Sequence, residues 1–504
     1  MDRVTVTGSL LCGLALSFCC LSLPAEANHL LWSRDGALTR QAAELVQILG
    51  DAQLYGLRPQ DYASDRLRGS IDNWVEFDRV LSAEVTRLLV HLHYGRIAPR
   101  AAGFDLPRPR ADLNTEMLLE QLATAADVRA VIATVEPRFY QYQLLKQALA
   151  RYRALASDAD LTRLPAFSGR SLKAGDPYSG APALRRLLSA LGDMDVQGEP
   201  LASSEILDTD LMQGLQRFQG RHGIDADGIL GRRSFASLTT PLSQRMLQIE
   251  LTLERLRWLP ALGAAPIVVN IPQFRLFALR SGAPPPAAVL QMPVIVGQIY
   301  PRLRTPVFMG EINSVLFRPY WDVPHSIVVR ELLSEIRARP DYLMRHGFEI
   351  VRGPGDDAKA VPPTKENIDA LASDELRLRQ RPGTDNALGL IKFVLPNAHN
   401  VYLHDTPAQQ LFLESRRAFS HGCIRVGDPV ALAIHVLRNT PGDWTADNVL
   451  AAMHGDATRR VDLSAPIPVL VLYGTAVASQ ADMVYFFEDI YGHDARLARL
   501  LQSQ

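Results

Sequence analysis

Cysteine is scarce in this chain of 504 residues. Three of its four cysteines lie within the first 20 residues, at positions 12, 19 and 20, so Cys423 stands alone in the rest of the sequence. A lone cysteine cannot form an internal disulfide, so it is either a buried thiol that packs or a functional one. Gly422 and His421 favour the functional interpretation, because a nearby imidazole can activate a thiol and glycine lets the backbone approach a ligand closely.

An excess of charge of either sign is also missing. Lysine and arginine total 53 against 54 aspartates and glutamates, only five of the basic residues are lysines, and no long basic run occurs. Nucleic acid is therefore not an expected partner. With 47% apolar and 21% charged residues, the bulk of the chain is typical of a soluble globular protein, and its length predicts about three domains.

Long apolar runs are absent beyond the N-terminus. Residues 1–27 contain a basic Arg3, an apolar run over 10–23 and the sequence Ala25-Glu26-Ala27. This pattern is typical of a signal peptide with an A-x-A cleavage site, so we expect an exported protein. The sequence leaves open whether the signal is cleaved or retained as a membrane anchor.

Helical periodicity dominates residues 28–165, which we interpret as a helical scaffold domain. His91 and His93 have no further ligand at metal-binding spacing, so no metal site is expected there. A turn-rich linker is expected over 166–182. Residues 183–240 predict three short helices, and the sequence from Leu215 to Gly228 resembles the small peptidoglycan-binding module. A connecting helix is expected over 241–263.

Short apolar and alternating runs separated by proline and glycine predict a mainly-β domain over 264–455. A segment rich in proline and charge, residues 318–382, interrupts these strands and contains an expected helix at 326–338. Such an insertion beside a functional loop is typical of a lid. Residues 456–504 are expected to form a strand and a helix that pack back on the scaffold or the catalytic domain. The fold class is therefore α+β and multidomain.

Three motifs lie in the region of Cys423: Asn386-Ala387-Leu388-Gly389, Tyr402-Leu403-His404-Asp405-Thr406-Pro407 and Phe419-Ser420-His421-Gly422-Cys423-Ile424-Arg425-Val426. In the last two, a histidine is followed by fifteen residues and then by Ser-His-Gly-Cys. These motifs resemble the catalytic domain of L,D-transpeptidases, in particular the large YcbB-like Gram-negative branch. Arg425 stands where many family members have asparagine and where this branch has arginine.

The resemblance implies a cysteine acyltransferase of the periplasm that acts on peptidoglycan. Cys423 would attack a tetrapeptide stem, release D-alanine and form a thioester that an amine of diaminopimelate type resolves into a 3→3 cross-link. His404 would be the general base, in a pre-formed thiolate–imidazolium pair, with Asp405 or a backbone carbonyl orienting its ring. The backbone N–H groups of Gly422 and Cys423 are the expected oxyanion donors. Substrate contacts are expected from Ser420, His421, Arg425, Tyr402, Asn386 and Trp321.

Several alternatives stay open at this point. Arg425 would either neutralise a carboxylate of the stem peptide or hold the loop through an ion pair, and aromatic residues such as Tyr402 would line the donor site or pack in the sheet. A hydrolase of L,D-carboxypeptidase or amidase type would use water at the same thioester, and a catalytically idle wall-binding scaffold is the third class. No cofactor is expected, other wall synthases are candidate partners, and we expect a monomer.

Overall fold

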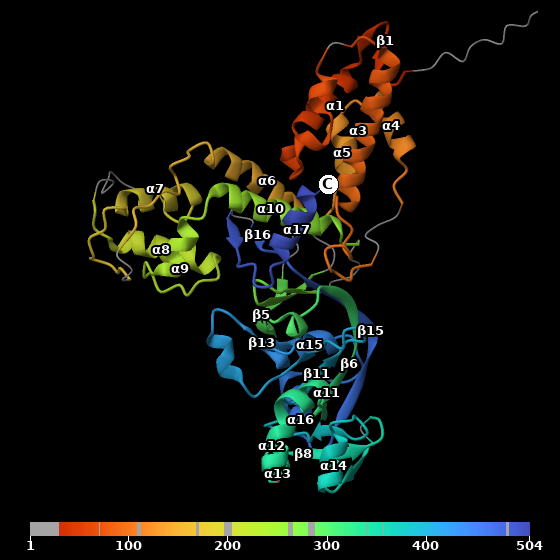
Figure 1. Ribbon diagram of the computed structural model, residues 1–504, viewed down its shortest axis with the longest axis vertical. Coiled ribbons are helices and arrows are strands. Elements are labelled where there is room, and N and C mark those ends of the chain that lie inside the picture. Colours follow the sequence, from red (N-terminus) through yellow and green to blue (C-terminus); the bar gives the residue numbers. More distant parts are fainter. Residues whose placement is uncertain are drawn as a thin grey trace, which may run out of the picture.

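The structure is a computed structural model of the whole chain. It describes residues 30–69, 71–107, 112–167, 171–195, 204–260, 266–280, 288–339, 341–355, 357–479 and 483–503. The expected signal peptide at 1–27 lies outside these residues. None of the helices in the described ranges is both long and apolar enough to cross a membrane. The N-terminal helical unit, the expected binding module and the main sheet meet around α10, and the insertion lies at the far end of that sheet (Figure 1).

The N-terminal unit is helical, as the periodicity predicted. Its longest helix, α3, begins after Asn73, whose side chain accepts hydrogen bonds from the N–H groups of Val75 and Glu76. Apolar side chains of α1, α3, α4 and α5 form one core. The elements are β1 (Ser33–Arg34), β2 (Ala37–Leu38), α1 (Arg40–Gly50), η1 (Ala52–Tyr55), η2 (Pro59–Asp61), α2 (Ser64–Leu67), α3 (Trp74–Tyr94), α4 (Thr115–Thr124) and α5 (Val128–Val135).

A second core joins the expected binding module to segments from outside it. The module's helices α7, α8 and α9 share buried side chains with α6, with α10 and with the hairpin formed by β16 and β17. The sequence placed α6 in the scaffold, but its buried face packs in this second core. The elements are α6 (Tyr140–Leu155), α7 (Ala181–Leu191), α8 (Thr209–Arg221), α9 (Arg232–Leu238), α10 (Leu242–Arg257), β16 (Ala476–Ala478) and β17 (Val484–Phe486).

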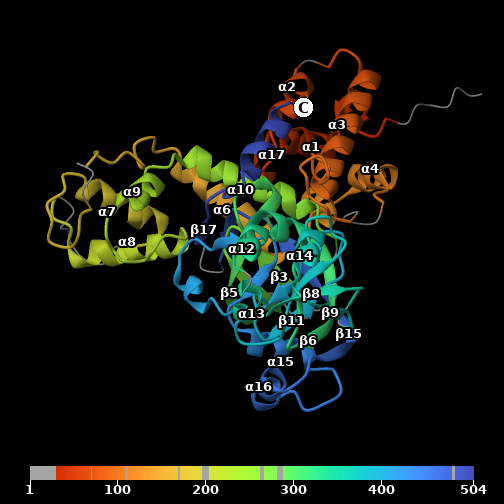
Figure 2. The same ribbon diagram turned by 60° about the horizontal axis from the view of Figure 1, so that its bottom comes forward.

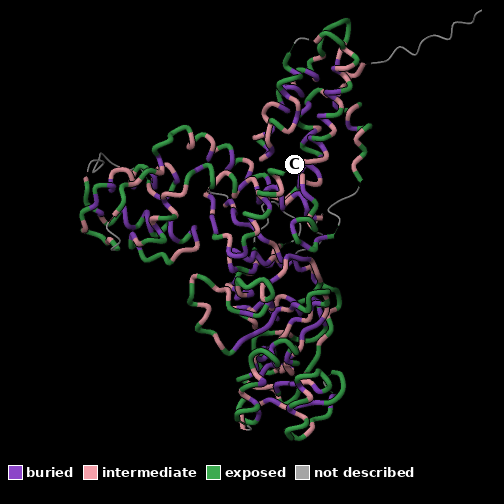
Figure 3. Tube along the Cα trace, in the orientation of Figure 1, coloured by how far each residue is buried: buried purple, intermediate pink, exposed green. Residues whose placement is uncertain are grey.

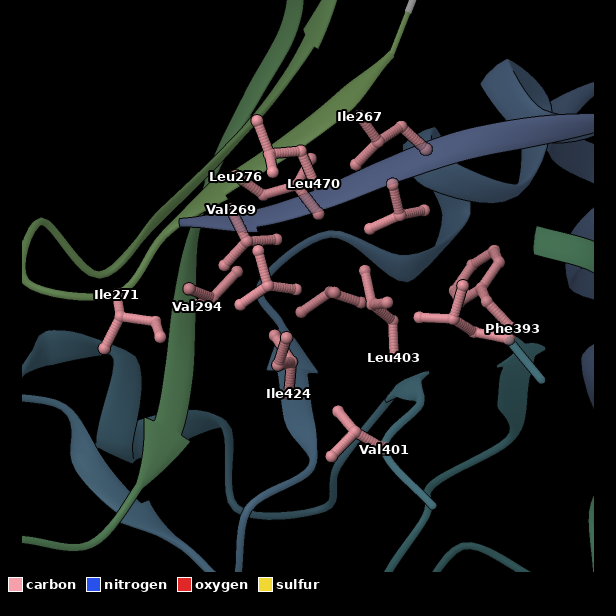
Figure 4. Packing of buried hydrophobic residues seen from close by; sticks show 14 of the residues in the cluster. Ile267, Val269, Ile271, Leu276, Val294, Phe393, Val401, Leu403, Ile424 and Leu470 are labelled. Atoms are coloured by element: carbon pink, nitrogen blue, oxygen red, sulfur yellow. The ribbon is translucent and has the colours of Figure 1, made fainter. Parts of the chain in front are cut away.

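The catalytic domain is built on a nine-stranded sheet in the order β13-β5-β14-β12-β11-β6-β15-β3-β4. Because β4 also pairs with β5, the sheet closes on itself. Apolar side chains such as Val294, Leu403, Ile424 and Leu470 converge inside it (Figure 4). The strands are β3 (Ile267–Asn270), β4 (Arg275–Leu279), β5 (Ala288–Gly297), β6 (Phe308–Phe317), β11 (Ile391–Val394), β12 (Leu403–His404), β13 (Ala418–Ser420), β14 (Ile424–Val426) and β15 (Arg459–Leu472).

The C-terminal segment belongs to both halves of the molecule. Strand β15 lies between β6 and β3 in the catalytic sheet, whereas α17 (His493–Gln502) packs on α10. Short helices complete the domain around the sheet: η3 (Pro301–Leu303), η5 (Gln409–Leu413), α15 (Pro429–Leu437) and α16 (Ala446–His454). The catalytic sheet therefore continues well past residue 455, where the sequence set a boundary.

The insertion folds around its own core. Strands β7, β10, β8 and β9 form a separate sheet, and apolar side chains from its strands and helices pack together. The expected helix at 326–338 is present as three consecutive helical segments, whereas the sheet of the insertion was not predicted. The elements are β7 (Trp321–Asp322), α11 (His325–Ile327), η4 (Val328–Leu332), α12 (Leu333–Ala338), α13 (Tyr342–Arg345), β8 (Phe348–Arg352), β9 (Lys359–Val361), α14 (Lys365–Ala370) and β10 (Arg377–Gln380).

Burial is distributed over these separate cores rather than gathered in one. Buried segments run through the helical unit, the second core and the catalytic sheet, with exposed loops between them (Figure 3). The view turned by 60° brings the insertion in front of the catalytic sheet (Figure 2). The functional motifs lie on the sheet that the insertion covers.

Candidate active site

The sheet brings the histidine motif and the cysteine motif of the sequence together on adjacent strands. Strand β12, which ends at His404, pairs in parallel with β14, and Leu403 stands opposite Ile424. His404 stands opposite Arg425, and Cys423 comes immediately before β14, so the lone thiol and the histidine are carried by two neighbouring strands of one sheet. A site built on strands holds its groups more firmly than one built on loops alone.

The loop that carries the cysteine is fixed by hydrogen bonds. Gly422 has a φ of +120°, a conformation that favours glycine. Its carbonyl accepts a hydrogen bond from Thr305 Oγ1 at 2.8 Å, and Thr305 Oγ1 in turn accepts from Gly297 N–H at 2.8 Å. Ser420 Oγ donates to the Cys423 carbonyl at 2.5 Å. The backbone around the thiol is thereby held in one geometry.

The Cys423 thiol is half-buried and points to the backbone of the preceding motif. Its Sγ lies 3.7 Å from the Asn400 carbonyl oxygen. Burial raises the pKa of the thiol, and hydrogen bonds from Tyr402 together with the positive charges of Lys392 and Arg425 oppose that rise. The resting enzyme therefore holds a protonated thiol near neutral pH.

The His404 imidazole is buried, with 4% of its surface exposed. Its Nδ1 lies 2.6 Å from the Asp405 carbonyl oxygen. Because a carbonyl only accepts, Nδ1 carries the hydrogen and Nε2 is the nitrogen that can take a proton. Burial and the charge of Arg425 lower the pKa of His404 to about 3, although the backbone of Asp405 opposes that shift.

These pKa shifts disfavour the expected thiolate–imidazolium pair in the substrate-free protein. The raised pKa of Cys423 and the lowered pKa of His404 both favour the neutral form, because burial penalises charge. Within the described part of the chain, no hydrogen bond links the two side chains. The Tyr402 ring stands beside His404, with 5.6 Å between the ring centroids, and its hydroxyl interacts with the thiol.

The orienting group for His404 is the Asp405 backbone and not its carboxylate. Asp405 Oδ2 accepts a hydrogen bond from the N–H of Leu390 at 2.9 Å, and Oδ1 accepts from Gln409 Nε2 at 3.2 Å. This carboxylate also occupies the space that a Cβ would need at Gly389, whose φ is +63°. The Asp405 carboxylate thus joins the histidine motif to the segment that ends at Gly389. Any larger residue at position 389 would collide with this carboxylate.

Arg425 stands on β14 with its guanidinium half-buried beside the thiol. Its Nε is buried and has no hydrogen-bond partner, and no carboxylate pairs with it among the residues that the structure describes. The alternative of an ion pair that holds the loop is therefore not supported. A buried, unpaired arginine donor is suited to an incoming carboxylate.

Tyr402 has more contacts at the site than the sequence suggested. The Lys392 ammonium lies 3.9 Å from the centroid of its ring, and Trp321 from β7 of the insertion forms a hydrogen bond with its side chain. Burial raises the pKa of Tyr402 well above its usual value. Tyr402 therefore joins the insertion to the nucleophile as a neutral phenol.

Two expected substrate contacts are instead structural. The Asn386 side chain is buried and donates to the carbonyls of Pro319 and Arg381, while its Oδ1 accepts from the Leu388 N–H. Its hydrogen bonds hold the end of the insertion and leave nothing for a ligand. Ser420 is likewise buried, and its hydroxyl shapes the cysteine loop.

The expected oxyanion donors differ from each other. The Gly422 N–H already donates to Ser420 Oγ at 3.2 Å. The Cys423 N–H has no hydrogen-bond partner within the described residues. The Cys423 N–H is therefore the better placed donor for a developing oxyanion, and the Gly422 N–H would have to leave Ser420 to join it.

His421 faces the insertion. Its Nε2 lies 2.8 Å from Glu331 Oε1 on η4, and both side chains are partly exposed. This contact joins the insertion to the cysteine loop, in addition to the Trp321 contact with Tyr402. His421 thus connects the insertion to the cysteine loop, and within the described residues its side chain forms no hydrogen bond with the thiol.

Sequence reasoning missed the residues that reach the loop from a distance. Tyr491, near the C-terminus, donates from its hydroxyl to the Gly297 carbonyl at 2.5 Å and accepts from the Thr305 N–H at 3.2 Å. No local pattern marks such a tyrosine, because the contact spans almost 200 positions. Lys392, opposite His404 in the pairing of β11 and β12, could have been found from strand alternation.

No group of three or more histidine, cysteine, aspartate or glutamate side chains gathers at metal-binding distance in the described ranges. His91 is instead bonded to the Tyr62 hydroxyl, with 2.9 Å between the two atoms, and His93 Nδ1 lies 3.0 Å from the Val135 carbonyl oxygen. Both histidines therefore serve the scaffold.

Comparison with known families identifies the domain that this site occupies. Residues 265–443 match the family model of the L,D-transpeptidase catalytic domain, YkuD, and residues 25–149 match that of a scaffold domain. The chain therefore carries a YkuD-type L,D-transpeptidase catalytic domain preceded by a scaffold domain, and the family expected from the cysteine motif is confirmed.

A protein of Haemophilus influenzae, provisionally named an L,D-transpeptidase, is 32% identical to this chain over 250 residues. The alignment covers 50% of this chain and 48% of the relative. The chain thus spans about half the length of the curated relative that it matches.

Proposed function

We propose that this protein is a peptidoglycan L,D-transpeptidase that forms 3→3 cross-links through a thioester on Cys423 and releases D-alanine. The observation that carries the proposal is the placement of Cys423 and His404 on adjacent strands of the YkuD-type domain, beside the unpaired guanidinium of Arg425. The proposed nucleophile, base and anion-binding group are thus carried by two neighbouring strands.

The first half of the reaction is acylation. As Cys423 Sγ attacks the carbonyl of the third stem residue, His404 Nε2 takes the thiol proton. The Cys423 N–H stabilises the oxyanion of the tetrahedral intermediate, and the proton passes to the nitrogen of the departing D-alanine. The bond to D-alanine breaks and a thioester remains. Catalytic hydrogen bonds are often incomplete without substrate, so His404 and Cys423 need not be bonded in the resting enzyme.

The second half transfers the acyl group to an amine. An acceptor amine of diaminopimelate type attacks the thioester, His404 removes its extra proton, and the thiol is restored. Water competes with the amine at this step. The insertion favours the amine, because contacts from Trp321 and Glu331 hold it against the site and a covered site excludes solvent.

The chemistry of the substrate fits the charges at the site. The stem peptide is anionic, and the planar fork of Arg425 is suited to bind one of its carboxylates in a bidentate manner. Peptidoglycan stem peptides, as a tetrapeptide donor and an amine acceptor, are the proposed partners. We propose further that the protein acts as a monomer in the periplasm, where such a substrate is found.

The decisive experiment incubates the purified protein with disaccharide tetrapeptides and identifies the products by mass. Release of D-alanine with cross-linked dimers is expected, whereas release with monomers alone would favour the hydrolase of carboxypeptidase or amidase type. Cys423→Ala should abolish release while keeping the fold, because it removes the nucleophile and little volume. A carbapenem should add covalently to the wild type and not to Cys423→Ala; an adduct at another residue would contradict the mechanism.

A further inference from the structure

A groove of about 1240 Å³ separates the binding module from the catalytic sheet. Helix α9 and helix α10 form one wall, and β4 with the segment before β13 forms the other. Pockets for small molecules usually enclose about 300–1,000 Å³, so this groove has room for a segment of a polymer. It is separate from the thiol, because neither Cys423 nor His404 lines it.

Positive charge gathers on both walls. Five arginines line the groove: Arg233 and Arg245 on the module side, and Arg275, Arg416 and Arg417 on the catalytic side. Of the three facing carboxylates, Glu488 lies 3.4 Å from Arg416, Asp494 is paired with Arg255 at 2.6 Å, and Asp489 accepts a hydrogen bond from the Tyr473 hydroxyl at 2.7 Å. Within the described residues, no carboxylate pairs with the other four arginines. The guanidinium of Arg245 is hydrogen-bonded to Gln248 and Ser237, and that of Arg417 is hydrogen-bonded to three backbone carbonyls. Arg233 and Arg275, one on each wall, are therefore the arginine forks that can match carboxylates of a ligand.

The remaining lining is amide and aromatic. Gln244, Gln273 and Gln291 line the groove together with Phe277 and Tyr485. Amide groups can donate and accept hydrogen bonds, and aromatic rings provide apolar contact area. A ligand that combines carboxylates, amides, hydroxyls and apolar ring faces would satisfy these walls better than a simple polyanion.

We propose that this groove binds an anionic segment of the peptidoglycan polymer, the glycan strand with its acidic stem peptides, apart from the stem that reacts at Cys423. The inference rests on the function proposed above and adds a second binding site to it. The groove would hold the polymer while its individual stems enter the active site.

The groove also borders the segment that leads into the cysteine loop. Arg233 Nη1 on α9 lies 3.3 Å from Ser415 Oγ across it, and Arg416 and Arg417 follow at once. Arg417 is adjacent to β13, which runs into the Ser420 to Cys423 loop. In Figure 1 the light-blue segment before β13 extends towards the side of the sheet on which the module lies. A polymer in the groove would therefore contact the chain that carries the thiol.

The test compares a groove variant with a charge-matched control. Arg233→Glu combined with Arg275→Glu reverses one charge on each wall. Arg186→Glu combined with Arg232→Glu makes the same change at exposed positions of the module that do not line the groove. Each protein is sedimented with insoluble peptidoglycan sacculi, and D-alanine release is measured from sacculi and from a soluble disaccharide tetrapeptide. Thermal unfolding checks that each variant is folded.

The groove variant should bind sacculi at least tenfold more weakly, and its ratio of polymer to soluble-substrate turnover should fall at least tenfold. The control should keep both values. An unchanged ratio and unchanged binding in the groove variant, or equal losses in the control, would overturn the proposal. If DNA displaces the protein from sacculi as well as soluble peptidoglycan fragments do, the groove attracts any polyanion, and the proposal is overturned too. If no protein releases D-alanine from the soluble substrate, the proposed function fails, whereas sedimentation still tests the groove.

Discussion

At the scale of single residues, burial decides the protonation states of the site. The pKa of Cys423 is raised and that of His404 is lowered to about 3, so the uncharged pair is the resting state. A proton then moves only as the thiol attacks, which makes the histidine a general base rather than the partner of a standing thiolate. Tyr402, which contacts both, keeps the pair in a low-dielectric setting.

This arrangement predicts that the free protein shows no thiolate absorbance in the ultraviolet at neutral pH. The thiolate should form only as the pH rises above 9.0, the ordinary pKa of the thiol, because the shift of Cys423 is upward. A pH titration of absorbance, with Cys423→Ala as the baseline, measures this directly. Thiolate absorbance that persists down to pH 6 would support the thiolate–imidazolium pair instead.

The two histidines near the thiol should differ sharply in kinetics. His404→Gln should lower acylation by on the order of 10²–10⁴-fold, because it removes the general base. His421→Gln should change it much less, since His421 contacts Glu331 and not the thiol. Stopped-flow acylation by a carbapenem measures both variants. A large loss for His421→Gln with a normal rate for His404→Gln would exchange the two roles.

The pH dependence of acylation follows from the same lowered pKa. His404 stays neutral, and thus able to accept a proton, from neutral pH down to about pH 3. We therefore expect no fall in the wild-type acylation rate as the pH drops through 6.5, the usual pKa of histidine. A fall in the acylation rate centred near pH 6.5 would show that burial does not lower the pKa of His404 in the reacting protein.

At the scale of elements, the insertion is a folded unit attached at two adjacent points. The Arg318 N–H donates to the Leu390 carbonyl at 2.8 Å, and Phe317 of β6 stands opposite Ile391 of β11. The unit between these residues has its own sheet and core. Removing it therefore leaves a strand pair that a short turn can close.

Replacing residues 319–389 by a short glycine-containing turn should shift the products from dimers towards hydrolysed monomers. The physical reason is that the thioester then meets water before an amine arrives. The ratio of dimers to monomers, read by mass, measures the shift. Glu331→Gln, which removes only the charge facing His421, is the milder comparison. An unchanged ratio in a folded deletion variant would leave the insertion as structural cover.

At the scale of the whole molecule, α10 joins the parts. Arg257 is fully buried, and its guanidinium donates to Glu254 Oε2 at 3.0 Å, to the Tyr142 hydroxyl at 3.2 Å and to the Tyr55 carbonyl. Glu254 also accepts from the Ile97 N–H at 2.9 Å. One buried ion pair thus links the end of α3, η1, α6 and α10.

Arg257→Ala should lower the free energy of unfolding by about 3–5 kcal/mol, because it leaves the Glu254 carboxylate buried without its partner. Arg232→Ala at an exposed position should stay within about 0.5 kcal/mol of the wild type. Urea unfolding followed by circular dichroism measures both. If the double variant Arg257→Met with Glu254→Gln is no more stable than Arg257→Ala, the unpaired carboxylate is not the cause.

The sequence alone determined the parts whose physics is local. Helical periodicity predicted the helical unit that contains α3, and short runs separated by proline and glycine predicted the mainly-β domain that contains β6 and β11. The lone cysteine after a glycine, with a histidine at fixed spacing, determined the family of the catalytic domain. Such signals can be recognised in the sequence alone, because each depends on residues that are close in the chain or belong to one motif.

Only the tertiary structure decided the protonation states, the partners and the boundaries. The neutral Cys423 and His404 follow from burial that strands far apart create together. Asn386 proved structural because Pro319 reaches it across the insertion, and Tyr491 supports the cysteine loop from the C-terminus. Helix α6 packs in the core of the expected binding module and not in the scaffold core where the sequence placed it. The arginine groove forms only where that module meets the catalytic sheet. Burial and long-range contacts have no local pattern, since they depend on what the fold places around a residue.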